Sequence, residues 1–294
     1  LEDQYHDRVY HPEDTHEIWI YGLDDEDTFE VTGKSKKIKV RLIGGQNNDN
    51  YIVAEGKNIF IYDYKSKKND VSQASKAHLK LQDKYNVNVY DYKKPKTSSS
   101  QFMPVLSWNT DYGFKIGAGA TFSYYGFKRN PFTSKHSINM AYYFATSGFD
   151  IDYKSEFAQV FGQTNLKLEA FYTSPNFALN FFGYGNESVN NVDQLGLNYN
   201  RVNTNTFRFK PSLIWRAYSG SIGSLGLSYE NIIVEETEGR YIEGNDSIPG
   251  YLFNANQFAG VHGRYEYSNA DNVAYPTVGL ETIIELGFKS NVDQ

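Results

Sequence analysis

The sequence predicts an all-β protein: a small β repeat module followed by an antiparallel transmembrane β-barrel. Residues 102–289 form segments of roughly ten residues in which apolar and polar side chains alternate. The chain contains 25 Tyr and 20 Phe, an aromatic content that girdles at two membrane interfaces would explain. It has no run of about 18 apolar residues, which excludes a helical membrane protein. A closed barrel is the remaining structure that can span lipid.

Residues 1–64 differ from the rest of the chain and contain an internal repeat. We expect stacked rungs, because repeats of 20–30 residues built as strand, turn and strand are typical of solenoids. A third strand, residues 59–62, follows the two copies. The copies lie 22 residues apart, and the matching pieces are 18–22 with 40–44 and 27–29 with 49–51.

The turns of this repeat suggest calcium as one interpretation. Residues 44–51 resemble the Gly-Gly-x-Gly-x-Asp nonapeptide of calcium-binding β-rolls, with Asn47 in place of the third glycine, and residues 22–29 have the same phase. Calcium prefers carboxylate and carbonyl oxygens. The alternative is an ordinary tight turn, which also favours Asn, Asp and Gly. The candidate calcium ligands are Asp24, Asp25, Asp27, Asn47 and Asp49; no other cofactor is indicated.

Residues 65–100 are rich in Lys, Ser and Asn and are interpreted as a connector with a short helix near residues 73–82. The lysines are interpreted as a solvated linker, in preference to a site for anionic lipid.

Residues 101–294 are predicted to form nine to eleven strands, the N-terminal portion of the barrel. Residues 137–145 place Ile138, Met140 and Tyr142 on one face and small or polar side chains on the other. In the last strand Glu281 and Glu285 stand opposite an apolar face and suit a wet lumen. One long acidic connection, residues 234–256, is expected outside the cell, since long barrel connections face outward.

The alternating pattern continues to the end of the sequence. Nine strands would leave open edges, which lipid does not tolerate. We therefore expect the barrel to be completed by residues beyond Gln294 or by another chain. The absence of an initiator Met at Leu1 indicates processing or a longer precursor.

Several short motifs resemble the bacterial surface-antigen barrel, the superfamily of outer-membrane assembly factors and two-partner secretion pores. The superfamily's Val/Leu-Arg-Gly-Phe/Tyr motif is absent, as expected if the chain stops before it. The matching pieces are residues 104–106, 111–117, 126–131 and 182–187, and Asp271 followed by residues 275–279. The structural positions of these motifs are Pro104, Gly113, Gly117, Gly183, Gly185, Asn186, Pro276 and Gly279.

The N-terminal module resembles the linker of a Bacteroidota subgroup in which a calcineurin-like metallophosphoesterase precedes this barrel. The resemblance lies in residues 15–25 and 41–45. It implies an enzyme domain upstream of Leu1. None of that enzyme's dimetal motifs is present, so no catalytic residue is assigned.

The resemblance implies a bacterial outer-membrane protein, with a periplasmic N-terminal module, that inserts, assembles or translocates polypeptides. Its implied partners are outer-membrane lipid and other outer-membrane or periplasmic assembly proteins. A net charge of −6 argues against nucleic acid, and the absence of Cys excludes disulfides and thiolate metal sites. The alternatives are a barrel that anchors or exports a metallophosphoesterase, and a passive pore or surface-structure protein.

Overall fold

The computed structural model describes residues 6–33, 37–93, 96–109, 113–186, 188–217, 219–243, 245, 248–272 and 274–293, and it is nearly all β. The chain divides into two compact units, Leu1–Lys96 and Thr97–Gln294. Among the described residues, no helix is both long enough and apolar enough to cross a bilayer.

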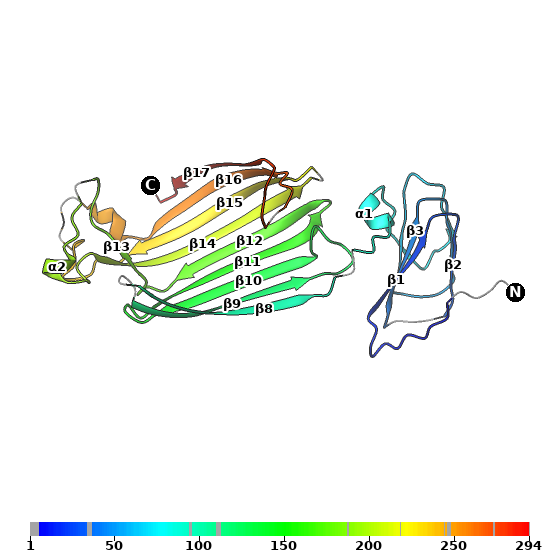
Figure 1. Ribbon diagram of the computed structural model, residues 1–294, viewed down its shortest axis with the longest axis horizontal. Helices are drawn as coiled ribbons and strands as arrows, with labels where there is room; N and C mark the ends of the chain where they lie inside the picture. The colour runs from blue at the N-terminus through cyan, green and yellow to red at the C-terminus, as the bar shows by residue number, and fades with distance from the viewer. Residues whose placement is uncertain are drawn as a thin grey trace. The chain divides into compact units, whose positions relative to one another are not determined.

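The first unit is built from two parallel sheets (Figure 1). One sheet has the order β1-β3-β5-β7 and the other β2-β4-β6, so consecutive strands alternate between the sheets as in a solenoid. The strands are β1 (Glu17–Leu23), β2 (Thr28–Val31), β3 (Lys39–Gly45), β4 (Asn50–Val53), β5 (Ile59–Tyr62), β6 (Asp70–Gln73) and β7 (His78–Leu79).

The strand register follows the 22-residue repeat of the sequence. Ile18 pairs with Val40 and Phe29 with Tyr51, each 22 residues apart. The Phe29 and Tyr51 rings stack with centroids 5.1 Å apart and planes 4° apart. Stacked rungs bury equivalent side chains against one another, and this cluster is the core of the unit. Its buried members are Phe29, Leu42, Tyr51, Val53, Ile59, Ile61 and Ala74.

The connector interpretation of residues 65–100 is wrong for much of that segment. No helix lies at residues 73–82; strands β6 and β7 add to the two parallel sheets, and the only helix of this unit in the described residues is α1 (Tyr85–Asn88). The reason is the open edge of each sheet, whose backbone groups accept a further strand. The Lys-rich sequence forms the third turn, where the Lys68 N–H donates to Asn48 Oδ1 (2.9 Å).

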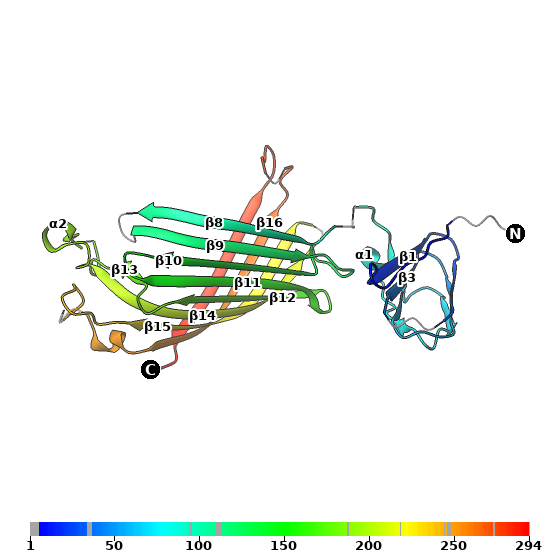
Figure 2. The ribbon, with the colours of Figure 1, turned by 90° about the horizontal axis from the view of Figure 1, so that it is seen from below.

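In the described residues, the second unit forms one antiparallel sheet of ten strands. This number lies within the nine to eleven strands that the sequence predicts. The order is β17-β16-β15-β14-β12-β11-β10-β9-β8, with β13 paired to β14. The sheet is twisted, and β16 runs steeply across β8–β12 in Figure 2. Within the residues that the structure describes, β8 and β17 do not pair with each other and are the two edges of the sheet. The elements are β8 (Ser99–Asn109), β9 (Gly113–Tyr124), β10 (Ser134–Tyr143), β11 (Gly148–Phe161), β12 (Thr164–Thr173), β13 (Ala178–Asn180), α2 (Val192–Leu195), β14 (Arg201–Arg216), β15 (Ser221–Val234), η1 (Gly250–Phe253), β16 (Asn256–Ser268) and β17 (Glu281–Asn291).

The register holds the alternating side chains on two distinct faces from strand to strand. Phe209 of β14 pairs with Tyr229 of β15, whereas the next pair is Arg208 with Glu230. We call the two surfaces the apolar face and the polar face. Exposed members of the apolar face include Phe102, Leu106, Trp108, Ile116, Phe122, Met140, Phe149, Phe209, Trp215, Leu225, Leu227, Val261, Leu286 and Phe288. The polar face carries Asp150, Asp152, Lys154, Glu156, Lys167, Glu169, Arg208, Lys210, Arg216, Glu230, His262, Arg264, Glu266, Glu285 and Lys289.

Two long connections lie at the same end of the sheet, opposite the end at which β8 begins. One is residues 235–255, the long acidic connection expected from the sequence. The other, residues 174–200, contains β13 and α2 and was not expected as a connection. The first residues of β14 extend beyond the end of β12, and there they pair with β13 instead.

Candidate functional site

A cavity of about 640 Å³ on the polar face is the candidate site. It lies over β11, β12 and β14–β17, toward the end of the sheet at which β14 turns into β15. The side chains lining it include charges of both signs, which period-2 alternation delivers to one side of the sheet. The charged lining residues are Glu156, Lys167, Glu169, Lys210, Arg216, Arg264, Glu266 and Glu285.

Arg216 connects three segments at one side of this cavity. Its guanidinium forms an ion pair with Glu156 of β11, with Nη2 3.0 Å from Oε2, and donates to the Asn130 carbonyl (3.2 Å). Asn165 of β12 is fully buried and donates both to Glu156 Oε1 and to the same carbonyl, each at 2.7 Å. The Glu156 carboxylate therefore has partners from β12 and β14.

Glu230 is the most deeply buried of the ion-paired carboxylates on this face, with its side chain 4% exposed. It accepts from Arg208 Nε of β14 (2.8 Å) and pairs with Lys289 of β17. Lys289 reaches Glu230 from two strands away, and Gly260 of the intervening strand is its register partner. This triad attaches the edge strand β17 to the interior of the sheet.

Three further contacts involve residues that line the cavity. Arg264 of β16 pairs with Glu285 of β17 and donates to Glu266 (2.9 Å). His262 Nε2 lies 3.1 Å from Ser212 Oγ. The charges lining the cavity are of both signs, and most of them form ion pairs. Such a surface is hydrophilic without the single-sign ring that selects ions in a channel.

The five calcium-turn residues lie in two different surroundings. Asp24 and Asp25 are exposed, and Asn47 Nδ2 lies 3.4 Å from Asp24 Oδ1 at the surface. Asp27 and Asp49 lie on adjacent rungs, where the Asp27 N–H donates to Asp49 Oδ1 (2.9 Å). In the described parts of the chain, no group of three or more His, Cys, Asp or Glu side chains is placed to hold a metal ion.

Asp27 and Asp49 belong instead to a buried acidic cluster with Asp63. Asp49 is 2% exposed and Asp63 fully buried, and the Tyr51 hydroxyl donates to Asp63 Oδ2 (2.7 Å). Burial raises the pKa of all three carboxyls, that of Asp49 to about 6. Repulsion from Asp63 and Asp27 adds to the effect at Asp49, and repulsion from Asp25 adds to it at Asp27. Gly44 leaves the space for this cluster, because a Cβ there would collide with Asp49, Tyr51 and Asp63.

Sequence reasoning missed Asp63 and the pairing on the polar face. Asp63 follows β5 directly and lies outside the Gly-and-Asp repeat that pointed to its neighbours. The alternation placed charges such as Glu156 and Glu285 on one face, but only strand order shows that Arg216 reaches Glu156 across β12. The burial of Asp63 beside Tyr51 depends on tertiary packing, and no sequence pattern predicts it.

The motif residues of the surface-antigen resemblance lie in an edge strand, at close backbone contacts and in turns. Pro104 lies within the edge strand β8, where a missing N–H is tolerated. Gly117 packs against the next strand, since a Cβ there would lie 2.5 Å from the Met140 carbonyl.

The other motif positions lie in connections, except Gly113, which is the first residue of β9. Gly113, Gly183, Gly185 and Gly279 all have positive φ, which favours glycine. Asn186 lies in the connection that contains β13 and α2, and Pro276 in the β16–β17 hairpin. Asp111, Tyr112 and Glu187 lie outside the described residues.

Comparison of the chain with protein-family models and with curated proteins gave no match.

Proposed function

We propose that the second unit is part of the wall of an outer-membrane β-barrel of the surface-antigen superfamily, and that the protein acts in the insertion or translocation of polypeptides at that membrane. The first unit is then periplasmic. The observation that carries the proposal is the separation of side chains between the two faces of the sheet, which the register holds across its nine-strand order.

The apolar face suits contact with lipid. Leu286 is 75% exposed and Leu227 60% exposed, and aromatic rings such as Trp108 lie on the same surface. A face of this size in contact with water would drive association. In a bilayer it contacts hydrocarbon, and the antiparallel pairing satisfies the backbone groups within the sheet.

The polar face suits contact with a hydrated polypeptide. Its paired charges of both signs, such as Glu156 with Arg216, present neither a cationic nor an anionic filter. A polypeptide contains both positively and negatively charged side chains. A wall that carried only one sign of charge would bind the side chains of the opposite sign. The unpaired outer edges of β8 and β17 require partner strands in lipid, from the same chain or from another.

Single-cysteine labelling tests the membrane orientation without background, because the chain has no Cys. Leu227→Cys and Ser228→Cys are adjacent on β15 and lie on opposite faces. In proteoliposomes we expect a charged maleimide to label S228C and a lipid-soluble maleimide to label L227C. Equal labelling of both positions by the charged reagent would contradict a lipid-facing surface.

A second assay tests the function itself. An unfolded outer-membrane protein is added to vesicles that contain the full chain, and its insertion is followed by protection from protease. Faster insertion than in empty vesicles supports the proposal. Conductance across planar bilayers without any effect on insertion would favour the passive pore.

A further inference from the structure

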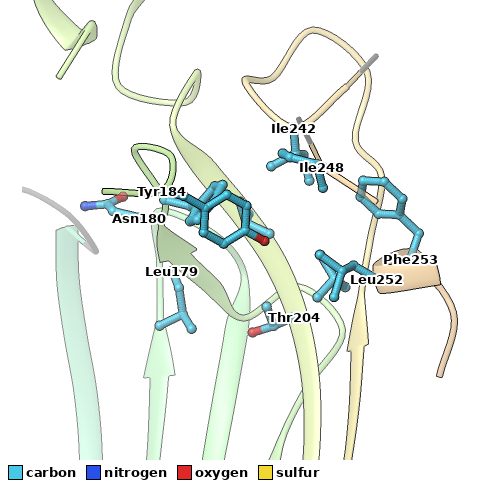
Figure 3. Close-up of a pocket in the computed structure, with 11 residues that line it drawn as sticks. Leu179, Asn180, Tyr184, Thr204, Ile242, Ile248, Leu252 and Phe253 are labelled. Carbon is cyan, nitrogen blue, oxygen red and sulfur yellow. The ribbon is translucent and has the colours of Figure 1, made fainter. Parts of the chain in front are cut away.

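An apolar pocket of about 310 Å³ lies at the end of the sheet that carries the two long connections (Figure 3). Its floor is formed by Val202 and Thr204 of β14 and Val234 of β15, which alternate in phase with Arg208 and Glu230. The pocket therefore lies on the polar face of the sheet. The alternation of apolar and polar side chains along the strands does not explain an apolar pocket on the charged face.

The roof comes from the long connection before β16. Ile242, Ile248, Leu252 and Phe253 point toward the hollow from that connection, and Tyr184 approaches from the opposite wall (Figure 3). No charged residue is among those lining the pocket in the described part of the chain. The apolar side chains of this acidic connection are thus gathered around one space.

Hydrogen bonds and a ring contact attach the connection that forms the roof to the start of β14 and to the connection before it. The Tyr241 N–H donates to the Tyr199 carbonyl (2.8 Å), and Arg240 Nη1 donates to the Arg201 carbonyl (3.0 Å). The Phe181 ring packs edge-on against Tyr241, with centroids 6.0 Å apart. Ile242, the next residue, is 3% exposed. These contacts preform the pocket, and preformed apolar hollows of this size are typical of ligand sites.

The lining defines the chemistry of the ligand. An apolar cavity of about 150 Å³ holds one benzene ring, so a pocket twice as large holds on the order of twelve carbon atoms. A charged group would lose its hydration without gaining a partner, and a peptide backbone would leave its N–H and C=O groups unpaired. The polar groups of the lining, Asn180, Thr204 and the Tyr184 hydroxyl, can contact one uncharged polar end.

We propose that this pocket binds a single hydrocarbon chain of about a dozen carbons with an uncharged polar end. The chain can belong to a membrane lipid or to a free molecule, since the recognition chemistry is the same. The inference rests on the pocket alone and does not depend on an activity in polypeptide insertion.

The test uses the full chain in lipid nanodiscs and a dodecan-1-ol that carries a diazirine near its tail. After irradiation, we expect saturable labelling of peptides from residues 179–184 and 242–253, competed by unlabelled dodecan-1-ol. Dodecanoate at pH 8 should compete at least tenfold more weakly, because its carboxylate has no partner. Non-saturable labelling, or labelling spread along the apolar face, would overturn the proposal.

Two substitutions fill the pocket, Leu252→Trp and Val234→Phe, and Leu227→Trp on the apolar face is the matched control. Labelling should be lost in both filled variants and retained in the control. Retention in both filled variants counts against the site, as does a hydrophobic hexapeptide that competes better than dodecan-1-ol. A phosphatidylcholine with a diazirine in its acyl chain identifies the source: labelling of the same peptides supports a membrane lipid, and labelling by the alcohol alone supports a free molecule.

Discussion

The backbone N–H of Asp27 donates to the side chain of Asp49, 22 residues later, with 2.9 Å between N and Oδ1. The same bond recurs one rung further on, where the Asp49 N–H donates to Asn69 Oδ1 (2.9 Å). In both cases a backbone N–H in one turn of the solenoid donates to the side chain at the equivalent position of the following turn. Because one of the three positions is Asn, the ladder needs a side-chain oxygen but not a charge.

Asp49→Asn is therefore expected to stabilise the first unit at neutral pH. The pKa of Asp49 is raised to about 6 in the folded state, from about 3.8 unfolded, so its contribution to stability is complete below about pH 4 and is lost as the pH rises through about 6. Two pKa units correspond to at most about 3 kcal/mol. Hydrogen exchange of the unit's strand amides between pH 4 and pH 8, corrected for intrinsic rates, should show a smaller loss of protection in D49N. A loss equal to that of the unsubstituted protein would disprove this role.

Gly44→Ala is expected to destabilise the same unit. The added Cβ would collide with the Asp49 and Asp63 carboxylates and the Tyr51 hydroxyl, which lie in a closely packed core. Overpacking of this kind costs about 1–3 kcal/mol. The measurement is the thermal midpoint of the full chain together with exchange at β3 and β4. Gly250→Ala, where a Cβ meets open space, is the control and should change neither.

Glu230→Gln is expected to loosen the edge strand β17. The change removes the charge that holds Arg208 and Lys289 and weakens charge-assisted hydrogen bonds worth about 1.5–3 kcal/mol each. Hydrogen exchange at residues 286–291 should accelerate. The matched control is Glu285→Gln, whose ion pair with Arg264 is exposed and worth at most about 1 kcal/mol. Equal effects of the two substitutions would show that burial of Glu230 has no role.

Asp271→Ala is expected to disorder the hairpin between β16 and β17. The Thr277 hydroxyl donates to Asp271 Oδ2, and Asp271 Oδ1 accepts from the backbone N–H groups of Thr277 (2.9 Å) and Val278 (3.1 Å). The hydroxyl bond first, and then the two backbone bonds, hold the pKa of Asp271 well below its usual range. A lowered pKa means that the stabilisation is present above about pH 4 and is lost only in strong acid. Amide exchange at Thr277 and Val278 should accelerate at pH 7 in D271A. Asp271→Asn keeps an acceptor oxygen and should restore part of the protection.

The sequence by itself determined the two periodicities of the fold. Alternation with period 2 assigned Phe209 and Arg208 to opposite faces, because successive side chains on a strand must diverge. The 22-residue spacing assigned Phe29 and Tyr51 to stacked rungs, because equivalent side chains of a solenoid lie above one another. Both rules depend only on a fixed spacing along the chain, two residues within a strand and 22 residues between rungs.

Only the tertiary structure decided which distant residues meet. Residues 65–82 show weak strand character, and β6 and β7 form because the preceding rungs present open edges. Asp63 joins Asp49 because two parallel sheets close around one core, and Lys289 reaches Glu230 because β17 lies two strands from β15. The apolar pocket arises in the same way, as Ile242 and Leu252 fold over Val202 from a connection that its composition marks only as acidic and long. Such contacts depend on strand order and chain path, which local periodicity does not encode.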